Sequence, residues 1–179
     1  VIENFRVNGA TSYTYGIDVR VCNSITVRKN DVHSAALTGI MTAHSYYSLV
    51  ENNEVHENGE HGTYMADSSD YGTQRGNYSW SNTRCGYHHN GGLPDGGDGQ
   101  MSYWLDEKNR ATGNPGAAFN YDGVSDSKMI NNLAYKNTHL GFALYCTDGA
   151  EGSRRNLVYN NTVYFTTAGY DCVSISNNG

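Results

Sequence analysis

The chain has few basic residues and very few prolines. Lysine and arginine total 12 against 18 aspartates and glutamates, which gives a formal net charge of −6 over 179 residues. An acidic chain without a basic stripe argues against nucleic acid as a partner. No run of 18 apolar residues occurs, so the sequence predicts no membrane span. The two prolines, Pro94 and Pro115, lie in glycine-rich segments typical of loops.

A helical period is also missing, since no window keeps apolar residues 3.6 positions apart for three turns. The four cysteines are widely spaced and form no CxxC pair, which argues against a zinc site. They are Cys22, Cys85, Cys146 and Cys172. A disulfide between Cys146 and Cys172 stays open, as does the alternative that each cysteine is a small buried apolar residue.

A repeat of about 23 residues runs through the chain, in which an Asn is followed nine positions later by a small residue. The pairs are Asn30/Gly39, Asn53/Gly62, Asn77/Gly86, Asn109/Ala118 and Asn132/Gly141, and Asn161/Gly169 follows at a spacing of eight. A fixed period of this length is typical of a solenoid, in which each repeat buries its apolar face against its neighbours.

The repeats read as short strands. Residues 25–33, 49–56 and 129–135 alternate apolar and polar side chains, and so do residues 39–43 and 141–145 after the small residue. Together with the Asn column, this pattern resembles the right-handed parallel β-helix proteins of the pectate-lyase-like superfamily. The resemblance implies an all-β solenoid of about seven coils, with the asparagines stacked as an inward ladder whose amides bond one another. Stacking satisfies buried amides repeatedly.

We expect residues 1–179 to form a single β-helix domain with a Gly/Asp-rich loop insertion at about 91–100. The sequence shows no signal peptide, does not begin with Met, and has no evident cap at either end. Natural proteins normally cover the exposed strand edges at the end of a sheet. We therefore expect either a longer parent chain or end-to-end self-association of copies.

Strand register predicts one outward polar patch across coils three to six, because adjacent coils lie roughly 4.8 Å apart. Its members are Tyr64, His88, Asn90, Asn120, Asp122 and Tyr145, with Asp67 at the margin. Such a surface suits an extended polar polymer such as a polysaccharide, although an ordinary solvated face would have a similar composition. The same register points Tyr170 and Cys172 inward on coil seven.

The insertion begins where the strand of His88 and Asn90 ends. Its two carboxylates, Asp95 and Asp98, could bind Ca²⁺ together with backbone carbonyls, and a plain solvated loop is the alternative. No other cofactor is indicated. Asp106 occupies an inward position, which is costly unless the carboxylate is paired, and Gln74 lies opposite it one coil away.

Three functions remain open from the sequence. A lyase would use His88 or a tyrosine as base, with Asn90 and Asn120 binding a uronate carboxyl group. Asp122 would orient His88 or serve as acid or base. An inverting hydrolase would use Asp67 and Asp122, roughly 9–10 Å apart by stacking, close to the range of ~6.5–9.5 Å for that class. The third is a non-catalytic carbohydrate-binding, adhesive or fibrous module.

The sequence departs from better-known members of the superfamily. The Arg-x-Pro-x-x-Arg pattern of pectate lyases and the Asp-Asp pair of polygalacturonases are both absent, and no outward Lys or Arg stands in the central patch. The fold itself hosts lyases, hydrolases, epimerases and inert spacers. The interpretation is an extracellular or cell-surface, secreted protein acting on a polysaccharide, without a pectin-type site.

Overall fold

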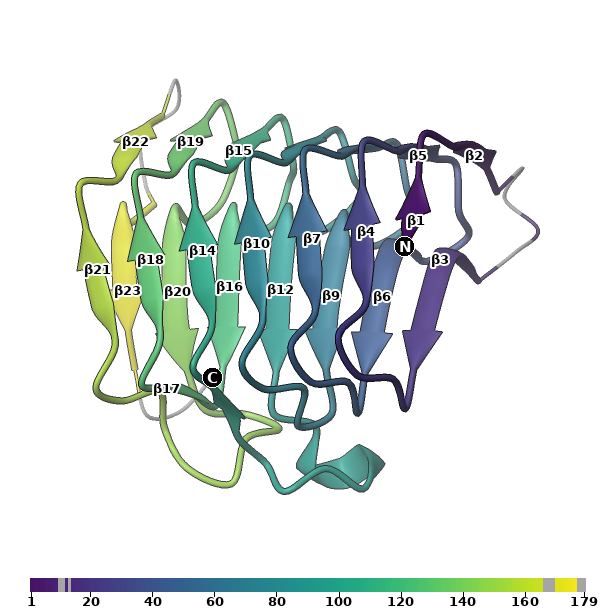
Figure 1. The fold of residues 1–179 in the computed structure, drawn as a ribbon. Helices are drawn as coiled ribbons and strands as arrows, with labels where there is room; N and C mark the ends of the chain where they lie inside the picture. The colour runs from purple at the N-terminus through teal and green to yellow at the C-terminus, as the bar shows by residue number, and fades with distance from the viewer. Residues whose placement is uncertain (10–11, 13, 166–169, 177–179) are drawn as a thin grey trace.

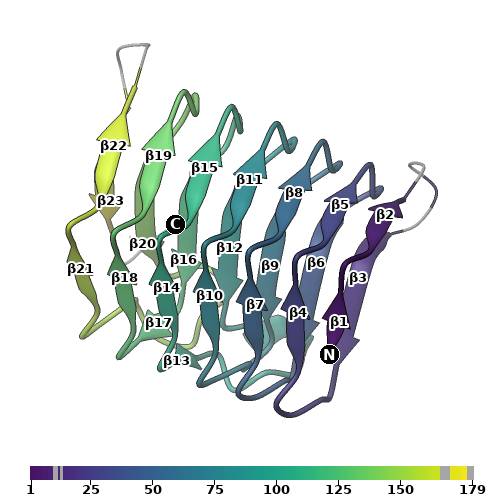
Figure 2. The ribbon, with the colours of Figure 1, turned by 45° about the horizontal axis from the view of Figure 1, so that its top comes forward.

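The computed structural model describes residues 1–9, 12, 14–165 and 170–176. The chain winds as a right-handed parallel β-helix of seven coils, whose strands form three parallel seven-stranded sheets (Figures 1 and 2). The predicted fold class and number of coils are therefore confirmed.

Each coil contributes one strand to each sheet. The first sheet contains β1 (Ile2–Glu3), β4 (Thr26–Arg28), β7 (Leu49–Glu51), β10 (Thr73–Arg75), β14 (Leu105–Glu107), β18 (Lys128–Ile130) and β21 (Leu157–Tyr159). The second contains β2 (Arg6–Asn8), β5 (Asp31–His33), β8 (Glu54–His56), β11 (Tyr78–Trp80), β15 (Arg110–Thr112), β19 (Leu133–Tyr135) and β22 (Thr162–Tyr164). The third contains β3 (Tyr15–Arg20), β6 (Thr38–Ala43), β9 (Thr63–Ala66), β12 (Tyr87–Asn90), β16 (Phe119–Asp122), β20 (Phe142–Tyr145) and β23 (Val173–Ile175).

The predicted asparagine ladder forms at the turn between the first and second sheets. The side-chain oxygen of Asn53 accepts hydrogen bonds from the backbone and the amide of Asn30, both at 3.0 Å, and Asn53 repeats the pattern with Asn77. The residue before each rung has a left-handed backbone, as at Asn52 (φ 54°) and Lys108 (φ 55°). This turn directs each Asn inward, where the next rung satisfies its amide.

A second ladder, which the sequence analysis missed, lies at the following turn. It consists of Asn58, Asn82, Asn114 and Asn137, whose side-chain amides are linked by hydrogen bonds of 2.9–3.1 Å. The ladder explains the small residue of each repeat: a Cβ added at Gly39 would lie 2.7 Å from the Asn58 amide nitrogen and 2.3 Å from a Val55 methyl group. The Asn161/Gly169 spacing ends at a residue outside the described part of the chain.

The insertion leaves the coil after β12. It forms the short 3₁₀ helix η1 (Leu93–Asp95) and then β13 (Met101–Ser102), which pairs with β17 (Val124–Ser125) of the next coil. In Figure 1 this segment projects below the end of β12. Gly92, at φ 66°, packs against Asp67, and a Cβ there would lie 2.3 Å from a carboxylate oxygen.

The expected register of coil seven is wrong. Val173 pairs with Phe142 and Ile175 with Leu144, so these two residues, rather than Tyr170 and Cys172, continue the inward columns. Residues 165–172 separate β22 from β23, whereas the shorter range 136–141 separates β19 from β20, so the extrapolated register does not hold for coil seven. Cys172 is exposed, and all four cysteines are free thiols.

Asp106 does face the core, opposite Gln74, and is 1% exposed. The Tyr121 hydroxyl donates to its carboxylate at 2.9 Å, and the Nε2 atom of His89 lies 3.5 Å away. The carboxyl group is therefore held in a buried polar network rather than left unpaired.

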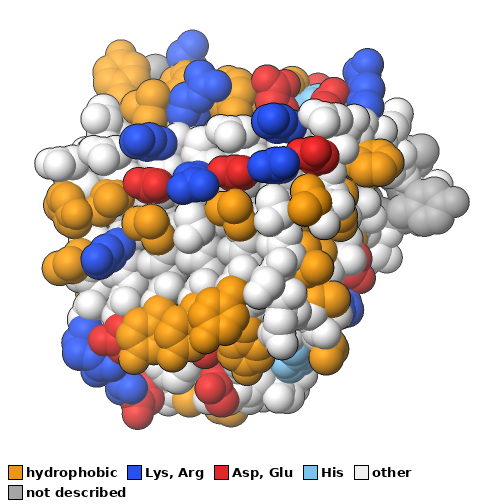
Figure 3. Space-filling model, viewed as in Figure 1, with side chains coloured by type: hydrophobic (Ala, Val, Ile, Leu, Met, Phe, Trp, Pro, Cys, Tyr) orange, Lys and Arg blue, Asp and Glu red, His pale blue; other side chains and the backbone are white. Residues whose placement is uncertain are grey.

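The outer face of the first sheet carries a row of alternating acidic and basic side chains (Figure 3). Arg28 pairs with Glu3 and Glu51, and Arg75 pairs with Glu51 at 2.9 Å. Arg28 and Arg75 are thus paired with carboxylates of neighbouring coils. Among the described residues, no helix is long and apolar enough to cross a membrane.

Candidate functional site

The predicted patch lines one cavity on the outer face of the third sheet. Parallel pairing puts His88 beside Tyr64 on one side and Asn120 on the other, and Asp122 beside Asn90 and Tyr145. The cavity has a volume of about 310 Å³. Its walls are Glu60, His61, Tyr64, Arg84, Cys85, His88, Asn90, Asn120, Asp122, Tyr145, Thr147 and Asp148. Six of the seven patch residues are therefore brought together, and Asp67 is the exception.

His88 lies at the centre of this cavity and is 7% exposed. Its ring stacks on His61 at 4.6 Å between centroids and meets Tyr64 edge-on at 4.6 Å. Burial lowers the pKa of His88 well below its usual value, and the neighbouring His61 adds to the effect. Burial also lowers the pKa of His61 to about 3. Both imidazoles are therefore neutral near pH 7.

Two amides connect the imidazole to two phenols. The Asn120 amide nitrogen lies 2.5 Å from Nδ1 of His88 and donates to the Tyr145 hydroxyl oxygen at 2.7 Å. The Asn90 amide donates to the Tyr64 hydroxyl oxygen at 3.0 Å. Because both phenol oxygens accept these bonds, their O–H groups are free to donate into the cavity. Burial raises the pKa of Tyr64 and Tyr145, which keeps both phenols protonated.

Asp122 lies at the floor of the cavity, but both of its oxygens are occupied. Its carboxylate accepts hydrogen bonds from the backbone N–H groups of Thr147, Asp148 and Gly149 at 2.8, 2.8 and 3.2 Å. The side chain is 1% exposed. Asp122 thus fixes the turn that follows β20, and His88 is contacted by Asn120 instead.

Asp67 lines a neighbouring cavity of about 340 Å³ together with Asp95 and Arg20. Burial raises the pKa of Asp67, and the nearby Asp95 carboxylate raises it further. Asp98, in contrast, accepts a bond from the Ser68 hydroxyl at 2.7 Å. Asp67 and Asp122 therefore line different cavities. Asp95 and Asp98 also have different contacts, since Asp95 lines the cavity of Asp67 and Asp98 is hydrogen-bonded to Ser68. Calcium binding by the loop stays a prediction.

Sequence analysis did not assign five wall residues to the site, all of which lie in turns. Arg84 and Cys85 precede β12, Glu60 precedes β9, and Thr147 and Asp148 follow β20. Arg84 pairs with Glu60 at 3.2 Å and supplies a cation at the rim, although no strand position of the patch carries one. These turn residues were missed because the alternation of apolar and polar side chains assigns register only within strands.

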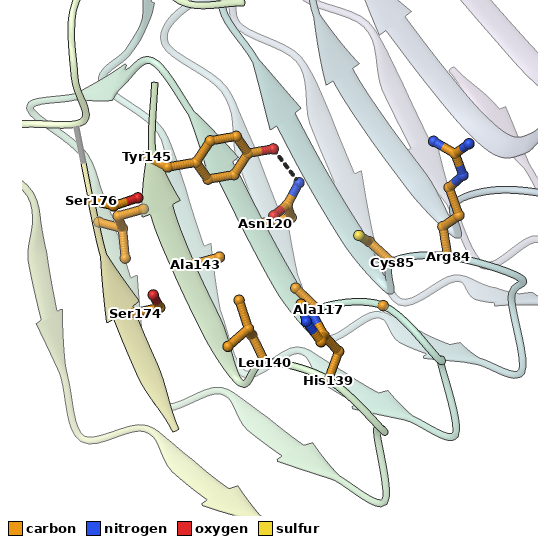
Figure 4. A pocket seen from close by; sticks show the side chains of 12 residues that line it. Arg84, Cys85, Ala117, Asn120, His139, Leu140, Ala143, Tyr145, Ser174 and Ser176 are labelled. Atoms are coloured by element: carbon orange, nitrogen blue, oxygen red, sulfur yellow. Dashed lines mark hydrogen bonds between the residues drawn. The ribbon is translucent and has the colours of Figure 1, made fainter. Parts of the chain in front are cut away.

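A second hollow of about 370 Å³ continues from the cavity along the sheet (Figure 4). The two spaces share Arg84, Cys85, Asn120 and Tyr145. Leu140, Ala117 and Ala143 give the hollow an apolar lining. The cavity beside Asp67, the cavity of His88 and this hollow lie along the third sheet across successive coils. An elongated ligand crossing the coils would contact all three.

Comparison with known proteins agrees with this architecture. In structural superposition, the periplasmic alginate epimerase AlgG matches 99% of this chain with a TM-score of 0.68 at 15% identity. An alginate lyase from Paenibacillus sp. str. FPU-7 matches 93% of this chain with a TM-score of 0.60 at 14% identity. The chain spans 43% of the length of AlgG and 80% of that of the lyase. Similarity at this level of identity shows the fold.

The sequence itself carries a family signature. No curated protein sequence matches the chain. The family described as "Right handed beta helix region" matches residues 1–95, more than half of the chain. The chain belongs to the right-handed β-helix family.

Proposed function

We propose that the chain acts on a uronate-containing polysaccharide by removing the proton at C5 of a uronate ring. The observation that carries the proposal is the neutral, buried imidazole of His88 with a phenol on each side and an arginine at the rim. Proton removal beside a carboxylate needs a base, a proton donor and a group that stabilises the negative charge. The cavity offers one of each.

His88 is the proposed base. A side-chain amide has nearly the same shape in its two orientations, so Asn120 can present its oxygen to Nδ1–H of His88. The lone pair then lies on Nε2, the ring nitrogen that Asn120 does not contact. In this orientation the Asn120 oxygen also accepts from the Tyr145 hydroxyl, so the Tyr145 O–H has to rotate away from Asn120 to reach the substrate. Because the imidazole is neutral near pH 7, it can accept a proton without first losing one.

Tyr145 is the proposed proton donor. It shares the Asn120 amide with His88, so base and donor are held on neighbouring coils. In β-elimination, the electron pair left at C5 forms the C4–C5 double bond while Tyr145 protonates the departing glycosidic oxygen. In epimerisation, a proton returns to C5 from the opposite face. Arg84 would bind the uronate carboxylate at the rim, where Glu60 is its present partner.

The solved structures similar in fold support this substrate class. One is an alginate epimerase and another an alginate lyase, and both names describe chemistry on a uronate polymer. The periplasmic location of the epimerase supports an extracytoplasmic location for this chain as well. A hydrolase is less well supported, because Asp67 and Asp122 line different cavities and the Asp122 carboxylate is bonded to three backbone N–H groups.

A non-catalytic glycan-binding module is the second candidate. It is favoured by the row of three connected hollows and by an Asp122 carboxylate that is engaged with backbone. Such a module would bind polymer across the third sheet without exchanging any proton.

The test is proton exchange at C5. Uronate polymers incubated with the protein in deuterated water should gain deuterium at C5 or release unsaturated products, and neutral polymers should do neither. His88→Ala and Tyr145→Phe should each lower the rate by at least ~10²-fold, the usual contribution of a positioned acid or base. NMR and product absorbance measure the two outcomes.

Tyr103→Phe is the matched control, because Tyr103 is 52% exposed and stacks on Tyr71 at 4.7 Å, away from the cavity. It should retain the full rate. Undiminished exchange in His88→Ala would reject the site. Binding of uronate polymer without exchange would establish the binding module instead.

A further inference from the structure

One group of potential metal ligands stands out in the described part of the chain. His61, Cys85 and His88 each have a donor atom within 4.8 Å of the donor atoms of the other two. All three side chains are buried, with exposures of 6, 8 and 7%. They lie on one wall of the 310 Å³ cavity, so the space between them opens to solvent.

The coil geometry holds these residues in place. Cys85 occupies the same turn position as His61 one coil away, since the Gly62 backbone N–H donates to the Cys85 carbonyl at 3.0 Å. His88 follows three residues later on β12. Because backbone ladders fix adjacent coils roughly 4.8 Å apart, the three donors are brought together before any ion arrives.

Two of the three donors are already in the state that a metal binds, which is neutral imidazole and thiolate. Burial keeps both imidazoles neutral. With its amide oxygen turned towards Nδ1–H of His88, Asn120 leaves the Nε2 lone pair free and is the type of second partner that orients a ligating histidine. Burial raises the pKa of the Cys85 thiol to about 11, so Cys85 would lose its proton to solvent only as the ion binds.

His61 is the ligand that has to adjust. The Cys85 backbone N–H donates to Nδ1 of His61 at 3.3 Å, and the ring is stacked on His88. Coordination through Nδ1 would replace this long hydrogen bond. Coordination through Nε2 would require the other tautomer of the ring. The first change is a rotation of the ring, whereas the second moves the ring proton to Nδ1 and gives up the hydrogen bond from the Cys85 N–H.

We propose that His61, Cys85 and His88 bind Zn²⁺, with a fourth position open to the cavity. Two nitrogens and one sulfur are a ligand set that zinc accepts, and three protein ligands with one open position are typical of accessible zinc sites. This proposal goes against the sequence analysis, in which the absence of a CxxC pair argued against zinc. The three ligands form no short sequence motif, because the stacking of two coils brings His61 next to Cys85 and His88.

Zinc binding has a consequence that rests on the proposed function. An imidazole nitrogen bound to zinc cannot accept a proton, so Zn²⁺ would inhibit removal of the C5 proton by His88. A chelator would restore the rate. Binding itself does not depend on that function, and the two are measured separately.

Metal binding is tested by titrating the purified chain with Zn²⁺ in a calorimeter and with Co²⁺ in a spectrophotometer. Zn²⁺ should bind once per chain, and Co²⁺ should produce a thiolate-to-cobalt charge-transfer band. Loss of an outer partner of a metal ligand already costs about 10–100-fold in affinity. Cys85→Ser and His61→Gln should therefore weaken zinc binding at least ~100-fold, and Cys85→Ser should abolish the cobalt band.

The matched controls are Cys146→Ser and His139→Gln, which change the same residue types outside the cluster and should bind normally. Zn²⁺ should also raise the unfolding temperature of the wild type but not of Cys85→Ser, because a ligand stabilises only the state that it binds. Absence of Zn²⁺ binding by the wild type, or a cobalt band that survives Cys85→Ser, overturns the proposal. Zinc binding by a chain that exchanges no C5 proton would reject the proposed function alone.

Discussion

At the scale of single residues, the chain keeps titratable groups in places where their charged forms are suppressed. Burial raises the pKa of Asp106 to about 7 and lowers that of His89 to about 3. The two side chains lie 3.5 Å apart in the core, and both are uncharged in the folded chain at mildly acidic pH. Burial favours the protonated carboxyl group of Asp106 and the deprotonated imidazole of His89. The two groups therefore change the stability in opposite directions as the pH rises.

The sign of the Asp106 contribution follows from linkage. Its folded pKa lies above the unfolded value, so between pH ~4 and ~7 the folded chain keeps a proton that the unfolded chain releases. The stabilisation is complete below pH ~4 and is lost as the pH rises to ~7, by at most about 4 kcal/mol. His89 opposes this in the same range, so the wild type should show only a weak slope.

Asp106→Asn isolates the effect. The stability of this variant relative to the wild type should rise as the pH increases from 4 to 7, as measured by urea unfolding at several pH values. Asp126→Asn is the control: the Arg155 side chain lowers the pKa of the partly exposed Asp126, so the contribution of Asp126 is lost only below pH ~4, and the relative stability of this variant should stay constant from pH 4 to 7. A relative stability of Asp106→Asn that is constant with pH would contradict the raised pKa.

At the scale of elements, each Asn rung links three coils. The oxygen of Asn53 accepts from the backbone and the amide of Asn30, and its amide donates to the Val27 carbonyl at 3.0 Å. Asn53→Leu leaves these buried groups without a partner and should cost about 1–3 kcal/mol. Asn161→Leu should cost less, because that rung is partly exposed and water can replace the lost bonds. Denaturant unfolding of both variants checks the order, and equal losses would contradict it.

The elements also show how far the sequence could be interpreted. The Asn column predicted the solenoid correctly, because a buried amide has few alternatives to stacking on its equivalent one coil away. The second ladder carried a signal as regular as the first, an Asn five positions after Asn53, Asn77, Asn109 and Asn132. It was missed because register was assigned only within strands, and these asparagines lie in turns. The same limitation concealed Arg84 and Cys85, and it misplaced coil seven. Strand register correctly predicted which side chains surround His88. It could not predict that backbone N–H groups of the turn after β20 bind the Asp122 carboxylate, because those hydrogen bonds depend on the conformation of the turn.

At the scale of the whole molecule, a β-helix is nearly one-dimensional, and each coil is stabilised by its neighbours. The last described coil has a neighbour on one side. Val173 and Ile175 continue the inward columns of Phe142 and Leu144, yet they are 47% and 74% exposed. An exposed apolar coil end and an unpaired strand edge favour association with a similar surface.

We therefore predict that particles made of these 179 residues associate end to end. Sedimentation velocity should show a mass that rises with protein concentration. Ile175→Lys should shift the mass towards 19.6 kDa, because a lysine at the coil end would oppose the burial of this surface. Leu93→Lys is the matched control: Leu93 is 50% exposed, but it lies in η1, away from the coil ends, and its replacement should leave association unchanged. A monomeric wild type at all concentrations would reject the prediction, and equal effects of both variants would place the contact elsewhere on the surface.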